Sequence, residues 1–111
     1  MEHQPGDIIW ALVTDPNGGN PKTRPLVVVA TPESGKLAAV AITGRVDLFD
    51  DASCVRLPWQ HSRHPRTKLT KPCLARCDWL VTLETTQVTQ SGGQVPAHVL
   101  QAILARLPKS S

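Results

Sequence analysis

Several features that would place a chain in a special class are missing from this sequence. No apolar run approaches the length of a membrane span, and the first six residues have neither the basic nor the apolar region of a signal peptide. A cytoplasmic protein with no membrane contact is therefore expected. Cysteines number only three, an odd count that fits a reducing compartment and argues against a disulfide framework.

The composition that is present is that of an ordinary globular protein. The 111 residues are 41% hydrophobic and 19% charged, which is enough to bury a core in one domain spanning 1–111. The sequence shows no internal repeat and no linker.

The net charge of +3 is unevenly distributed along the chain. Residues 1–53 sum to −3 and residues 54–111 to +6, and no carboxylate occurs between positions 56 and 76. That stretch carries eight basic or imidazole side chains, namely Arg56, His61, Arg63, His64, Arg66, Lys68, Lys71 and Arg76. Such a patch suits a polyanionic ligand, and it equally suits a solvated loop that only keeps the protein soluble.

The apolar pattern predicts strands first and a helix last. The expected elements, in order, are strands at 7–14, 25–31, 36–43 and 54–57, a long basic loop at 59–71, one or two strands at 73–83, and a helix at 96–107. The second and third strands form a hairpin, and turns are expected at 47–51 and after residue 83. This order indicates an α+β domain or a small barrel capped by a helix.

A basic segment, Lys22-Thr23-Arg24-Pro25, precedes the apolar run of the second strand. Pro25 fixes its own φ and favours extended geometry at Arg24, so the guanidinium sits at a rigid loop end that could grip a phosphate. Alternatively, Arg24 only solvates the loop end. The glycine-rich segment before it lacks the closing Gly-Lys-Ser or Gly-Lys-Thr of a Walker loop, which argues against nucleotide binding.

Alternation along the 73–78 segment predicts a second polar pair. In an extended chain Arg76 and Asp78 share one face, and Cys73 and Cys77 point to the other. The pair is either a plain surface ion pair or a carboxylate that takes a proton beside a cation that holds an oxyanion. A zinc site is disfavoured because the cysteines are spaced C-x-x-x-C with no second pair, so buried thiols and no metal are expected.

These segments, taken together, resemble the PemK/MazF toxins of type II toxin-antitoxin systems. The resemblance covers the chain from Gly6 to the C-terminal helix and rests on Gly6-Asp7-Ile8-Ile9-Trp10, Lys22-Thr23-Arg24-Pro25-Leu26-Val27-Val28-Val29, Ala41-Ile42-Thr43 and Arg76-Cys77-Asp78 in this order. It implies a mainly β fold with a C-terminal helix, an SH3-like small barrel of the PemK/MazF/CcdB type. It also implies a homodimeric endoribonuclease that cleaves single-stranded RNA without a cofactor and is blocked by a cognate antitoxin.

The resemblance also implies a set of catalytic residues. Arg24 matches the arginine of the family's Arg-Pro motif and Thr43 the threonine that ends the third strand, while Arg76 and Asp78 match the Arg-Cys-Asp motif of the Kid branch. Asp78 would be the base for a 2′-hydroxyl, and the arginines would stabilise the phosphate charge. A guanidinium loses its proton only above a pH of about 12, so Arg76 is assigned to charge stabilisation before acid work.

One departure from the Kid branch is the lack of a histidine in the loop at 17–23. His61 or His64 from the long loop could take its place in space. The expected RNA-binding residues are Lys22, Thr23, Trp59, His61, Arg63, His64, Arg66 and Lys68, with Trp59 stacking on a base or simply packing.

Two other functions remain open at the level of sequence. The same barrel could be a non-catalytic module that binds RNA or a protein. It could also be a gyrase poison of the CcdB type, although the terminal Pro-Lys-Ser-Ser lacks the Trp-Gly-Ile of that group.

Overall fold

The computed structural model describes residues 3–14, 19, 21–49 and 52–107. Its elements are β1 (Asp7–Val13), β2 (Lys22–Ala30), β3 (Lys36–Thr43), α1 (Val46–Phe49), β4 (Cys54–Leu57), β5 (Cys73–Glu84), the 3-10 turn η1 (Thr85–Gln87), β6 (Val88–Gln94) and α2 (Ala97–Arg106). Neither helix is long and apolar enough to cross a bilayer, within the ranges just given.

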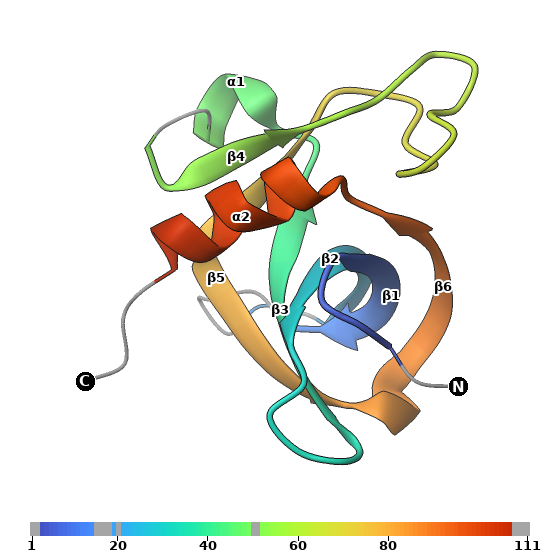
Figure 1. The fold of residues 1–111 in the computed structure, drawn as a ribbon, viewed down its shortest axis with the longest axis vertical. Helices are drawn as coiled ribbons and strands as arrows, with labels where there is room; N and C mark the ends of the chain where they lie inside the picture. Colours follow the sequence, from blue (N-terminus) through green and yellow to red (C-terminus); the bar gives the residue numbers. More distant parts are fainter. Residues whose placement is uncertain (1–2, 15–18, 20, 50–51, 108–111) are drawn as a thin grey trace.

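The strands form one antiparallel sheet in the order β4-β5-β3-β2-β1-β6. Figure 1 shows this sheet curling strongly, with β6 bending around one side and α2 lying across the other end. The expected mainly β fold with a C-terminal helix is confirmed. Among the described residues the outer strands β4 and β6 do not pair with each other, so the sheet is curved but not closed into a full barrel.

Two apolar clusters pack on opposite faces of the sheet. One contains Val27, Val40 and Ala75 and is covered by Val99 and Ile103 of α2. The other contains Ile9, Leu26, Leu37 and Ala41 from the alternate positions. Strands buried on both faces need nearly continuous apolar sequence, which explains the run from Leu26 to Val29. Helix α2 starts after Pro96, whose fixed φ suits a helix start, and its buried residues follow the expected helical spacing.

Strand β2 begins earlier than the sequence predicted. The segment expected as a loop end is already strand, because Lys22 to Pro25 pair with Val13 to Trp10 of β1. The described pairing with β3 begins only at Leu26, so Pro25 lies where β2 has one partner strand and its missing N–H leaves no gap in the ladder to β3.

The sequence predicted turns in the two places where the structure has strand β6 and the short helix α1. Strand β6 has the composition of a turn, with two glycines and mostly exposed residues, and it is held as a strand by pairing with β1 from Asp7 to Ala11. Gly93 is buried beneath the long loop, where a Cβ would collide with the carbonyl of Thr67. Helix α1 is a single turn, too short for its period to be visible in sequence.

Strand β5 contains the bend that the sequence left open. Val40 of β3 pairs with Leu80, but the next residue, Ala41, pairs with Arg76. The residues from Cys77 to Trp79 therefore have no partner in the described β3–β5 ladder. Instead, the Cys77 amide donates to the Ser53 carbonyl at 2.9 Å. Such a bulge re-aims side chains, and this one carries Asp78 and Trp79.

Candidate active site

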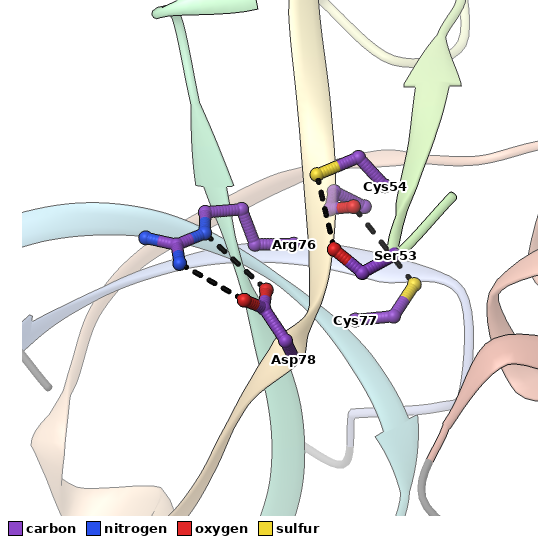
Figure 2. A network of polar contacts seen from close by, with 6 residues as sticks. Ser53, Cys54, Arg76, Cys77 and Asp78 are labelled. Carbon is purple, nitrogen blue, oxygen red and sulfur yellow. Dashed lines mark hydrogen bonds and ion pairs between the residues drawn. The ribbon is translucent and has the colours of Figure 1, made fainter. Parts of the chain in front are cut away.

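An arginine beside the bulge of β5 and a carboxylate within the bulge form a forked ion pair. Arg76 Nε donates to Asp78 Oδ1 at 3.3 Å, and Nη2 donates to Oδ2 at 3.0 Å. The Arg76 side chain is 17% exposed and that of Asp78 is 47% exposed. Figure 2 shows the pair on one side of β5, with Cys77 directed to the other side, as alternation predicted. A two-point pair with a partly buried arginine is fixed in orientation, unlike a typical surface ion pair.

A tryptophan that sequence reasoning did not single out joins this pair to β2. The Cζ atom of Arg24 lies 5.3 Å from the centroid of the Trp79 ring, and that of Arg76 lies 5.4 Å from it. Both distances are within the range in which a guanidinium is attracted to an aromatic ring. The two motif arginines, which come from β2 and β5, therefore meet at one indole. The signal in the sequence was only that Trp79 directly follows Asp78.

The second part of the site is a hollow of about 530 Å³, here called the Arg24–Thr43 hollow. Its lining includes Trp10, Arg24, Thr43, Arg45, Lys68 and Lys71. Thr43 ends β3, and its Oγ1 accepts a hydrogen bond from the Arg45 amide at 3.1 Å. Trp10 is 37% exposed, so part of its ring is available for stacking. Trp10, Arg45 and Lys71 were not among the expected site residues.

The four residues that the resemblance implies are catalytic do not all line one hollow. Arg24 lines the hollow and contacts Trp79, whereas Arg76 and Asp78 do not line the hollow. Arg24 is thus the link between two adjoining parts, one with the hydroxyl of Thr43 and one with the Arg76–Asp78 pair. The Nε atom of Arg24 is buried, so the inner end of this guanidinium is packed inside the protein.

The expected RNA-binding residues fall into separate groups. Thr23 and Lys68 line the Arg24–Thr43 hollow, and Arg66 lies with Lys68 at a second hollow described below. Lys22, the first residue of β2, is exposed and lines neither of these two hollows. Three other expected residues, Trp59, His61 and Arg63, also line neither hollow.

The two loop histidines have different surroundings. Trp59 and His61 form an edge-to-face ring pair with centroids 4.9 Å apart. His64 Nδ1 accepts hydrogen bonds from the amides of Arg66 and Thr67 at 3.1 and 3.2 Å, so this ring shapes the loop. Neither histidine lines the Arg24–Thr43 hollow. Residues 15–18 and 20 of the loop before Arg24 lie outside the described residues.

The cysteines are core residues. Cys54, Cys73 and Cys77 are all buried, and none of the three forms a disulfide. Burial raises the pKa of the Cys77 thiol from 9.0 to about 11, and nearby Cys54 adds to this shift. A neutral, buried thiol is a poor nucleophile and a poor metal ligand. Across the described ranges, no three His, Cys, Asp or Glu side chains come together in a group that could hold a metal ion.

Solved structures of other proteins share this fold. The chain resembles an endoribonuclease from a mycobacterial species, solved in complex with its cognate antitoxin, with a TM-score of 0.71 and 15% identity over 96% of this chain and 91% of that one. It also resembles the Mycobacterium tuberculosis toxin MazF-mt6, with a TM-score of 0.68 and 19% identity over 91% of both chains. The MazE-MazF structure from Deinococcus radiodurans gives a TM-score of 0.70 and 19% identity over 95% of this chain and 91% of that one.

The sequence itself gives the family. The model of the PemK-like, MazF-like toxins of type II toxin-antitoxin systems matches residues 4–110, so the chain belongs to this family. No curated protein matches it in sequence.

Proposed function

We propose that this chain is the toxin of a type II toxin-antitoxin system and acts as a metal-independent endoribonuclease on single-stranded RNA. The observation that carries the proposal is the meeting of Arg24 and Arg76 on Trp79, with Asp78 held in the fork of Arg76. Membership in the PemK-like, MazF-like family supports it. The site of action would be the cytoplasm.

In the proposed reaction the 2′-hydroxyl attacks the adjacent phosphorus. The O2′–P bond forms as the P–O5′ bond breaks, the hydroxyl proton passes to Asp78, and the departing 5′-oxygen takes a proton from Arg76 or water. A carboxylate has about four lone-pair sites, and the bonds from Arg76 use two of them. Asp78, half-exposed, can therefore accept a proton without leaving its partner.

The arginines would stabilise the charge that builds up on the phosphate. Arg24 and Arg76 approach from two strands, and their planar forks match phosphate oxygens. Because Trp79 and the sheet already fix both groups, little reorganisation is needed when the charge appears. Thr43 would orient a phosphate or a ribose by its hydroxyl at the other side of Arg24.

Two partners are part of the proposal. The mycobacterial and Deinococcus structures are complexes with antitoxins, which supports a cognate antitoxin for this chain. Leu12, Leu80 and Leu104 are exposed large apolar side chains that a second copy or an antitoxin could cover. The family resemblance favours a homodimer.

The test uses purified protein and single-stranded RNA in EDTA. Cleavage by the native protein is expected to leave 2′,3′-cyclic phosphate and 5′-hydroxyl ends and to be lost in both Arg24→Ala and Asp78→Ala. Lys36→Ala, which removes one charge from an exposed position at the start of β3, is the matched control and should cleave normally. Binding without cleavage would instead support a non-catalytic module, and intact RNA with gyrase trapped on DNA would support a gyrase poison.

A further inference from the structure

A second hollow, of about 460 Å³, lies at the long loop and β6 and has no role in the reaction described above. We call it the His3–Arg66 hollow, since these residues line it together with Asp7, Pro65, Lys68 and the segment 91–94. Lys68 lines both this hollow and the Arg24–Thr43 hollow. The two hollows therefore adjoin at one cation.

The backbone that carries the two cations of this hollow, Arg66 and Lys68, is held in place by buried contacts. Thr67, between exposed Arg66 and Lys68, is only 1% exposed. Its Oγ1 donates to the Pro58 carbonyl at 2.8 Å and accepts from the Leu69 amide at 3.2 Å. The loop is also tied to β6, because the Gln94 amide donates to the Arg66 carbonyl at 2.9 Å. A loop fixed at its centre loses little entropy when its charged side chains bind a ligand.

The balance of charge in the hollow favours an anion. Among the described residues that line it, the one carboxylate is that of Asp7, which is already engaged because it accepts from the Gln94 side chain at 3.0 Å and from the Gln4 amide at 2.9 Å. Against it stand Arg66 and Lys68. The space beside Gly92 is open, since no atom of another part of the chain lies within 4 Å of where its Cβ would be. A phosphate could approach the backbone closely here.

The chemistry of the lining points to the sugar-phosphate backbone and not to a base. None of the described residues that line it is a tryptophan, phenylalanine or tyrosine, whereas the Arg24–Thr43 hollow has the exposed ring of Trp10. Contacts to phosphate position a strand without reading its sequence. A phosphate held here would add affinity for any sequence.

We propose that the His3–Arg66 hollow is a phosphate subsite for the same RNA strand that is cleaved at Arg24, with Lys68 contacting the strand between the two hollows. This inference rests on the proposed function. It predicts that RNA extending beyond the cleaved segment binds more tightly than a short fragment, and that the gain comes from Arg66 and depends on salt.

The experiment measures binding of 2′-O-methyl oligonucleotides, which lack the attacking hydroxyl, as a trinucleotide and as a dodecamer of mixed sequence. The native protein should prefer the dodecamer. Arg66→Ala should reduce this preference by roughly tenfold, because a hydrogen bond to a charged group is lost. It should also reduce the slope of log affinity against log salt by about 0.7, the value for one phosphate contact on a single strand.

Lys36→Ala is the control, since it removes one positive charge from an exposed position that lines neither hollow. Equal losses of RNA affinity in both variants would overturn the subsite, because they would indicate only a general attraction of RNA to positive charge on the protein. A loss of binding to polyglutamate, but not to RNA, in Arg66→Ala would also overturn it, because the hollow would then serve an acidic protein segment. Cleavage of unmodified RNA in EDTA is measured in parallel. If the native protein cleaves but shows no length preference, the subsite fails and the proposed function stands; if it neither cleaves nor binds RNA, both fail.

Discussion

Arg24 on β2 and Arg76 on β5 both lie about 5 Å from the ring centroid of Trp79, although strand β3 separates their strands. The indole thus fixes the spacing of two like charges that would otherwise repel each other. Attraction to the ring face offsets part of that repulsion. The relationship makes Trp79 a positioning residue for the proposed reaction, and this can be measured.

Replacement of Trp79 by alanine should impair cleavage more than RNA binding. Each cation–π contact contributes about 0.5–1 kcal/mol, so loss of both should reduce kcat by a factor of about 5 to 30. Trp79→Phe keeps a ring face and should recover most of the loss. Steady-state cleavage of a fluorogenic RNA, with Kd measured on a 2′-O-methyl analogue, checks this. Equal kcat in Trp79→Ala and the native protein would show that the ring does not position the arginines.

Replacement of Arg76 by lysine should be nearly as damaging as replacement by alanine. Lysine keeps the charge but cannot form the two parallel bonds with Asp78, so the carboxylate loses its fixed orientation. We expect kcat to fall by about 10² to 10³, as for loss of one donor to a developing oxyanion. Single-turnover cleavage measures the effect. Near-native rates in Arg76→Lys would mean that only the charge matters and that the fork has no role.

The contact between Gly93 and the long loop can be tested by adding one methyl group. A Cβ at position 93 would collide with the Thr67 carbonyl, so Gly93→Ala should lower the free energy of unfolding by about 1–3 kcal/mol. Gly92→Ala is the matched control, because nothing lies within 4 Å of its Cβ position. Urea denaturation of both variants measures the difference. Similar midpoints would indicate that the loop moves aside at no cost.

The Cys77 thiol should be unreactive in the folded protein and should make stability sensitive to alkali. Because burial raises its pKa from 9.0 to about 11, the folded state keeps the proton after an unfolded chain has lost it. The contribution of the protonated Cys77 thiol to the free energy of unfolding is therefore complete below pH 9.0 and is lost as the pH rises towards 11. Urea midpoints across this range should fall less in Cys77→Ala than in the native protein. Rapid labelling of native Cys77 by iodoacetamide at neutral pH would contradict this assignment.

Much of the fold could be predicted because local patterns agree with tertiary burial. The apolar run that ends at Ala30 and the segment Lys36–Thr43 have the composition of buried strands, and the structure places both near the middle of the sheet. Strand β6 could not be predicted, because its stability comes from pairing with β1 and from the fit of Gly93 under Thr67. Neither interaction leaves a pattern within Val88–Gln94 itself.

The candidate site shows the same division. Alternation along an extended chain was enough to place Arg76 beside Asp78, since that relationship is local. The role of Trp79 depends on a bulge that shifts the β3–β5 register, and the position of Arg24 depends on pairing between β1 and β2. Thr67 was part of a segment expected to be a long basic loop, yet it is buried. Its neighbours are polar, so sequence gives no sign of the bonds that hold it.

The anchoring of the basic loop on β6 has a consequence for synthesis of the protein. The loop precedes β5 in the chain, yet part of its anchoring comes from Gly93 and Gln94, which the ribosome adds later. Contacts of such long sequence separation form late in folding. A nascent chain that has already exposed Arg24, Thr43 and the basic loop therefore still lacks the contacts that β6 makes beside Lys68 and Arg66. Translation of the last strand and helix becomes the step that completes the side of the molecule on which we propose that RNA binds.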